Sequence, residues 1–139
     1  MTKLPRGLDD VLYEGEWLCI RAMRRQNGRL PAVEWWGSLD TRGRAKFLAA
    51  AAVVENTLRA GRPPAGRLEK VVGSEVGLLE LRVTPKGGRP PHLRLLVLRR
   101  GRTLWVANGF TKQKNQLERA DVKLGERIAS EWLQEGGEG

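Results

Sequence analysis

The chain has 139 residues, of which 40% are hydrophobic and 29% charged, a composition that excludes a disordered protein. Lysine and arginine outnumber aspartate and glutamate by 25 to 16, and the formal net charge of +9 favours an acidic partner such as nucleic acid. The single cysteine, Cys19, cannot form an internal disulfide. Together with the single histidine, His92, it does not supply the ligands of a Cys/His zinc site, so we expect no metal.

The sequence indicates a cytoplasmic protein without membrane contact. Its longest apolar run, residues 47–54, is far shorter than the roughly 20 residues that span a bilayer. The first residues, MTKLPRGLDDV, lack the apolar segment of a signal peptide. The length predicts one domain over residues 1–139, with residues 1–15 and 135–139 loosely ordered.

The first predicted elements are a strand and two helices. Apolar residues on both faces of residues 17–23 predict a partly buried strand. Pro31 suits the first position of a short helix that carries Trp35 and Trp36, which cannot both point at the core. A second helix runs from a cap at Asp40 or Thr41 to about residue 60, with an apolar stripe formed by Phe47, Leu48, Ala51, Val54 and Leu58.

A Gly/Pro-rich connector, residues 61–77, separates these helices from the rest of the chain. Alternating residues then predict strands at 78–84, 93–99 and 103–107, the last two joined by a turn at Gly101. Asn115 and Glu118 have the spacing of a capping box for a final helix. We therefore expect an α+β fold with helices on one side of a mainly antiparallel sheet of about four strands, two helices before the sheet core and one C-terminal helix.

Basic side chains occur at fixed places on these strands. Glu80 and Arg82 share one strand face, because side chains alternate along a strand. Arg94 is expected to be exposed on the next strand, and Lys112 and Lys114 follow the last one. Fixed cations on one face of a sheet suit a polyanion, whereas the alternative for Glu80 and Arg82 is an ordinary ion pair on a solvated face.

The ordered pattern resembles a known family. Glu80-Leu81-Arg82, then Arg94 opening an apolar strand, then Gly109-Phe110-x-Lys112 and a closing amphipathic helix are similar to the phage-derived, HigB-like branch of the RelE superfamily. These proteins are toxins of type II toxin–antitoxin modules. The resemblance implies a RelE-like fold over about residues 17–134 and metal-free cleavage of mRNA on the ribosome, with a small antitoxin protein as partner and no cofactor.

The resemblance also assigns roles to particular residues. Arg82, Arg94 and Lys112 match the family's basic positions, and Glu80 is a candidate base beside Arg82. Metal-free cleavage uses the ribose 2′-OH as nucleophile, so the substrate is RNA, and fixed cations stabilise the phosphoryl charge. The expected RNA-binding set is completed by Lys114, Arg99, Arg102 and Lys86.

Two other functions stay open at this point. Leu79 stands where family members often carry an aromatic residue, which keeps a non-catalytic module that binds RNA or an acidic protein as an alternative. The superfamily also includes inhibitors of DNA gyrase, so a gyrase-directed toxin is a third candidate. His92 follows the Pro-rich residues 85–91 and is expected to be an ordinary exposed loop residue.

Overall fold

The computed structural model describes residues 9–64, 66–84, 87–114 and 116–137. In this part of the chain the elements are β1 (Val11–Glu14), β2 (Cys19–Ala22), α1 (Pro31–Ser38), α2 (Thr41–Arg59), β3 (Leu68–Lys70), β4 (Leu79–Arg82), β5 (His92–Arg100), β6 (Thr103–Lys112) and α3 (Arg119–Gln134). The α+β class is confirmed. The sheet, however, has six strands where about four are expected from the sequence.

Two strands that the sequence does not predict form the edges of the sheet. β1 lies within residues 1–15, expected to be loosely ordered, and β3 lies within the connector of residues 61–77. They have four and three residues, too few for an alternating pattern to be recognised. They form because β2 and β4 offer them backbone hydrogen bonds in antiparallel pairings.

The strand order is β1-β2-β6-β5-β4-β3. Only the β2–β6 pairing is parallel, and the other four pairings among the described strands are antiparallel, so the sheet is mixed. β6 therefore lies between the N-terminal hairpin and β5, and the neighbouring strands β4, β5 and β6 carry Arg82, Arg94 and Lys112.

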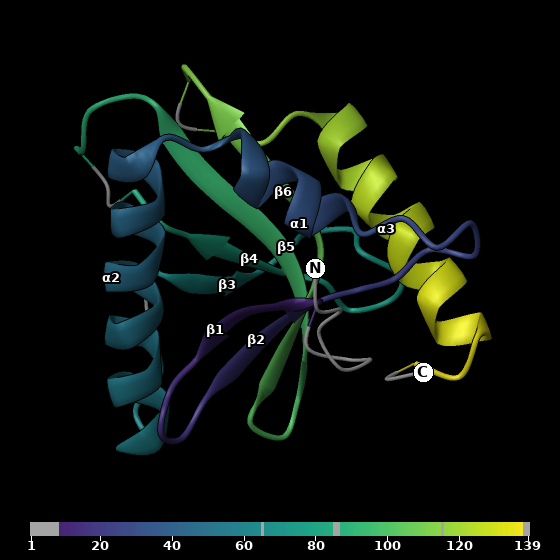
Figure 1. Ribbon diagram of the computed structural model, residues 1–139, viewed down its shortest axis with the longest axis horizontal. Helices are drawn as coiled ribbons and strands as arrows, with labels where there is room; N and C mark the ends of the chain where they lie inside the picture. Colours follow the sequence, from purple (N-terminus) through teal and green to yellow (C-terminus); the bar gives the residue numbers. More distant parts are fainter. Residues whose placement is uncertain (1–8, 65, 85–86, 115, 138–139) are drawn as a thin grey trace, which may run out of the picture.

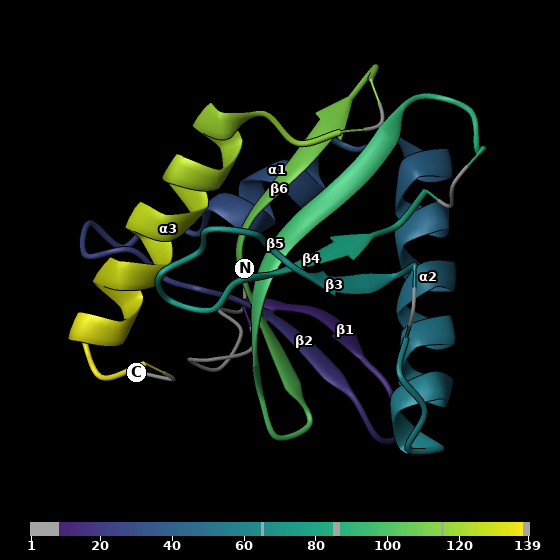
Figure 2. The same ribbon diagram turned by 180° about the vertical axis from the view of Figure 1, so that it is seen from behind.

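The helices cover both faces of the sheet rather than one side. Figures 1 and 2 show the twisted sheet between α2 and α3. On the α2 side, Phe47 and Leu95 belong to one buried cluster, and on the α3 side Leu96 and Trp132 belong to another. α3 approaches closely at Gly125, where an added Cβ would lie 2.5 Å from Leu96 Cδ1. A glycine that disfavours the isolated helix thus permits its docking.

α2 has the predicted cap and a different exposed face. The Asp40 side chain accepts a hydrogen bond of 2.7 Å from the backbone N–H of Gly43. Phe47 and Val54 are buried as expected, whereas Leu48 is 41% exposed and does not join the buried stripe. No helix in the described ranges is both long enough and apolar enough to cross a bilayer.

The two adjacent tryptophans occupy different environments, as the sequence predicts. Trp35 is buried, whereas Trp36 is half-buried beneath the guanidinium of Arg44, 5.2 Å from the ring centroid. The Trp35 ring lies against Gly109, where an added Cβ would be 2.3 Å from Cδ2 of the ring. Because glycine leaves this space, β6 continues past Ala107, the predicted end, and carries Lys112 into the sheet.

A buried carboxylate fixes the N-terminal hairpin to α2. Glu55 accepts hydrogen bonds from Tyr13 Oη (2.6 Å) and from the backbone N–H groups of Trp17 (2.8 Å) and Leu18 (2.6 Å). Burial acts to raise the pKa of Glu55, but these three hydrogen bonds outweigh it, so the pKa lies below its usual value. Burial and the bond to Glu55 raise the pKa of Tyr13 to about 12. The ionised form of Glu55 is thus the one that the fold stabilises.

Replacing Glu55 with Gln is expected to lower the free energy of unfolding by about 2 kcal/mol at pH 7, because charged hydrogen bonds are lost. Since the folded-state pKa is lowered, wild type loses this advantage as the pH falls below about 4.3, the ordinary glutamate value. Urea denaturation from pH 7 to pH 3 measures the difference. Glu75→Gln, at an exposed position, is the control, and an effect of Glu55→Gln equal to the control would contradict the assignment.

Candidate functional site

The strand register gathers the predicted cations on the α3 side of the sheet. Arg82 pairs with Arg94 across β4 and β5, and Arg94 pairs with Phe110 across β5 and β6. One step further along the same face, His92 pairs with Lys112. Directly paired residues have their side chains on the same face of a sheet. The register therefore places two neighbouring lines of paired residues on one face. Their polar members, which are Arg82, Arg94, His92 and Lys112, are named here the Arg82–Lys112 row.

Glu80 lies between the two arginines. Arg94 Nη1 is 2.8 Å from its carboxylate, and Arg82 Nε is 2.5 Å from Oε1. Arg82 also lies 3.7 Å from Glu69 on the edge strand β3. The hydrogen bond to Glu80, and then the charges of Glu80 and Glu69, raise the pKa of Arg82 above its usual value although burial opposes this. Arg82 therefore stays charged and can act only as a cation.

Burial differs sharply within this group. The side chains of Arg94 and Glu80 are 6% and 9% exposed, whereas that of Arg82 is 35% exposed. The expectation that Arg94 is exposed is therefore wrong. Glu80 and Arg94 form a buried ion pair beneath the more accessible Arg82. An incoming anion therefore meets Arg82 first.

Lys112 is held from the other side by the first turn of α3. Its Nζ is 2.6 Å from Asp121 Oδ2 and 3.9 Å from Glu118 Oε1, and it lies 5.8 Å from the centroid of the Phe110 ring. Asp121 also accepts a hydrogen bond from the backbone N–H of Glu118, the N-cap of α3. Asn115, expected from the sequence to cap this helix, lies outside the described residues, and the N-cap is Glu118 instead, so the predicted capping box begins three residues too early. The start of α3 thus positions the cation at the end of β6.

The position of His92 is not the one expected from the sequence. It is the first residue of β5 rather than an exposed loop residue, and it is 5% exposed. Its Nδ1 is buried and has no hydrogen-bond partner within the described ranges. Such groups are rare, because burying a polar atom without a partner costs free energy. Its spacing of two residues from Arg94 is the signal that places the two on one strand face.

The other predicted RNA-binding residues are not all brought to this row. Lys114 is exposed just beyond Lys112. Arg99 and Arg102 lie at the β5–β6 turn, the opposite end of the hairpin from Lys112, where Arg102 covers the ring of Trp17. Lys86 lies outside the described residues. Two of the four residues are therefore separated from the Arg82–Lys112 row by most of the length of the hairpin.

The carboxylates near the row are occupied by cations. Glu80 contacts two arginines, and Asp121 contacts Lys112. Among the residues described here, no three His, Cys, Asp or Glu side chains are grouped as metal ligands would be. The groups that the row presents to a ligand are therefore fixed cations and one histidine.

Replacing Arg94 with Met is expected to lower the free energy of unfolding by about 3 kcal/mol, because Glu80 loses one partner inside the protein. The double variant Glu80→Gln/Arg94→Met should recover a large part of this loss, because it removes the buried negative charge of Glu80 together with the positive charge of Arg94. Denaturant titrations of both variants and of the single variant Glu80→Gln measure the coupling. Arg99→Met, at an exposed position of the same strand, should change stability by less than about 0.5 kcal/mol. Additive single effects of Glu80 and Arg94 would contradict the buried pair.

No family model and no curated protein matches this chain. The resemblance to toxins of the RelE superfamily therefore stays a prediction. The function proposed below is supported by the arrangement of the Arg82–Lys112 row and by the charge of the chain.

Proposed function

We propose that this protein is the toxin of a type II toxin–antitoxin module and cleaves translated mRNA without a metal. The observation that carries the proposal is the Arg82–Lys112 row, in which strand register brings two arginines, a lysine and a histidine to one sheet face. The formal charge of +9 adds a long-range attraction for RNA. The cytoplasm, where ribosomes carry mRNA, is the proposed location.

The proposed reaction is an intramolecular phosphoryl transfer. The ribose 2′-oxygen attacks the adjacent phosphorus, the bond to the 5′-oxygen breaks, and a 2′,3′-cyclic phosphate and a free 5′-hydroxyl result. A base removes the proton of the 2′-hydroxyl, and an acid supplies one to the leaving 5′-oxygen. Negative charge gathers on the phosphoryl oxygens, where preorganised cations stabilise it.

Arg82 and Lys112 are assigned to the phosphate. Arg82 has the more exposed guanidinium of the pair and keeps donor groups beyond the one directed at Glu80. Lys112 reaches the phosphate by exchanging Asp121 for a phosphoryl oxygen, since one ammonium group can donate to several acceptors. Arg94 and Glu80 act as positioning residues, because their charged groups contact each other and Glu80 holds Arg82 in place.

His92 replaces Glu80 as our candidate for proton transfer. The Glu80 carboxylate contacts two arginines, which leaves it no free approach to a ribose hydroxyl. Histidine is the side chain most often used for proton transfer, and the buried Nδ1 of His92 has no partner in the described part of the chain. Its position opposite Lys112 places it beside the proposed phosphate site.

A second candidate function is a non-catalytic module that binds RNA or an acidic protein through the same row. The observation that favours it is the neutralisation of all three cations by Glu80, Glu69, Glu118 and Asp121. Paired cations attract a phosphate less strongly than free ones, because the ligand must compete with the carboxylates. Cleavage separates this candidate from the first.

Lys112→Gln is expected to lower the rate of mRNA cleavage about 100-fold, because one cation is lost from the charged transition state. Primer extension on cellular mRNA after induced expression measures the cuts, with wild type and Lys123→Gln beside it. Lys123 is exposed on α3 and makes no ion pair with a described carboxylate, so its replacement makes the same change in charge away from the row. Equal cleavage by both variants would remove Lys112 from the site, and intact mRNA in all three at equal protein levels would favour the non-catalytic module.

Asp121→Asn is expected to tighten the binding of a 2′-O-methyl RNA about threefold, because it releases Lys112 from its ion pair. The amide oxygen still accepts the hydrogen bond from Glu118, so α3 keeps its cap. Fluorescence anisotropy at several KCl concentrations should also show a steeper salt dependence, by about one unit of slope. Glu75→Gln removes one negative charge elsewhere, and an equal gain in that variant would mean that only net charge matters.

A further inference from the structure

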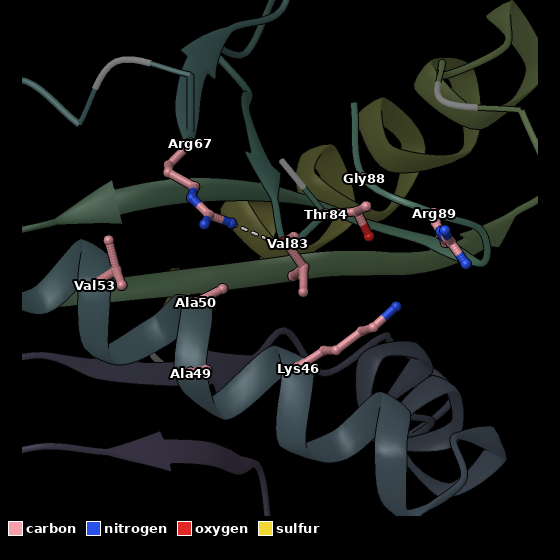
Figure 3. Close-up of a pocket in the computed structure, with 9 residues that line it drawn as sticks. All are labelled: Lys46, Ala49, Ala50, Val53, Arg67, Val83, Thr84, Gly88 and Arg89. Carbon is pink, nitrogen blue, oxygen red and sulfur yellow. Dashed lines mark hydrogen bonds between the residues drawn. The ribbon is translucent and has the colours of Figure 1, made fainter. Parts of the chain in front are cut away.

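A pocket of about 300 Å³ lies on the opposite side of the sheet from the Arg82–Lys112 row. It is bounded by α2, by the residues that follow β4, and by the residue that precedes β3. Figure 3 shows the nine residues that line it, which are Lys46, Ala49, Ala50, Val53, Arg67, Val83, Thr84, Gly88 and Arg89. Val83 belongs to the buried cluster on the α2 side, so the sheet separates this pocket from the row. The pocket is therefore a second, independent feature of the surface.

Three cations surround the pocket, and no carboxylate in the described part of the chain pairs with them. Arg67 donates to the backbone carbonyl oxygens of Val83 (2.5 Å) and Arg82 (3.3 Å), which fixes its guanidinium at the rim without cancelling its charge. Lys46 and Arg89 make no ion pair with a described carboxylate, and Figure 3 shows their charged ends directed toward each other. Like charges that face each other favour an anion between them. This contrasts with the row, where acidic side chains contact every cation.

The floor of the pocket is apolar and continues onto the outer surface of α2. Ala49, Ala50 and Val83 form this floor, and Val53 at the edge of the pocket is 47% exposed. Val53 is one of only three large hydrophobic side chains exposed in the described residues. Exposed apolar surface rimmed by charge is typical of a protein-binding site.

We propose that this pocket and the adjoining surface of α2 dock an acidic segment of a partner protein, with an apolar side chain between Asp or Glu residues. The apolar side chain fills the space over Ala49 and Val53, and the carboxylates contact Lys46 and Arg89 at one end and Arg67 at the other. Charge complementarity determines this choice of partner. RNA fits less well, because no aromatic ring lines the pocket on which a base could stack. The proposal does not depend on the activity of the Arg82–Lys112 row.

Peptide display on the full chain tests the chemistry of the occupant. A random peptide library is selected on wild type, and each enriched peptide is then measured against Ala49→Phe, which fills the pocket, and against Ala45→Phe. Ala45 is exposed one helical turn earlier and does not line the pocket, so its replacement is the matched control. We expect enriched peptides in which acidic residues flank an apolar one. Ala49→Phe should lower the affinity of these peptides about tenfold, while Ala45→Phe should leave the affinity unchanged.

The charge of the pocket is tested separately. Lys46→Gln/Arg89→Gln should lower the affinity of the same peptides about tenfold. The control Arg42→Gln/Arg62→Gln has the same net charge, and both of its sites are exposed outside the pocket, so it should leave the affinity unchanged. Peptides without acidic enrichment, or equal binding by both double variants, would overturn the proposal. So would loss of RNA binding in Lys46→Gln/Arg89→Gln alone, which would make the pocket an RNA surface, or a change of oligomeric state in Ala49→Phe, which would assign it to a second copy of the chain.

Discussion

The Glu80 carboxylate, held between Arg82 and Arg94, is the interaction on which the candidate site depends. Removing three charged groups from water costs free energy, and this arrangement recovers it only because each arginine has a donor within 2.8 Å of the same carboxylate. One negative charge thus fixes two guanidinium groups on neighbouring strands. A phosphate that meets Arg82 finds a cation whose position is already set by the sheet beneath it.

α3 makes a corresponding contribution from the other side of the row. Gly125 lets the helix approach Leu96, and this docking brings Asp121 to Lys112 at the end of β6. The helix therefore positions a cation and at the same time neutralises it. Without a bound anion the row is nearly neutral, which avoids the repulsion that clustered cations would cause. A ligand must therefore be able to replace a carboxylate. A phosphodiester supplies such oxygens at regular spacing.

Part of this arrangement follows directly from the sequence. Strand alternation places Glu80 with Arg82, and the turn at Gly101 determines that β5 and β6 pair. The shared face of Arg94 and Lys112 does not follow from the sequence, because a register shift between Leu96 and Val97 changes which residues of β6 lie opposite Arg94 and His92. The burial of Arg94 does not follow from it either, because it depends on Glu80 and on how β4 packs beside β5. Edge strands β1 and β3 are too short to carry a pattern, and they depend on partners elsewhere in the chain. The hydrogen bonds of Glu55 are also not predictable, because Glu55 lies in α2 and its three donors lie in the N-terminal hairpin, far away in the sequence.

The two faces of the sheet differ in how charge is arranged, which separates the proposed RNA-binding row from the proposed partner surface on α2. The central claim is that the Arg82–Lys112 row contacts the RNA backbone. The most direct measurement is an NMR titration of the arginine Nε–H and histidine ring resonances with a 2′-O-methyl RNA that cannot be cleaved. The account predicts that the Arg82 and His92 signals shift together while that of Arg99, at the far turn, does not. Shifts confined to Arg67 and Arg89, with Arg82 and His92 unchanged, would contradict it.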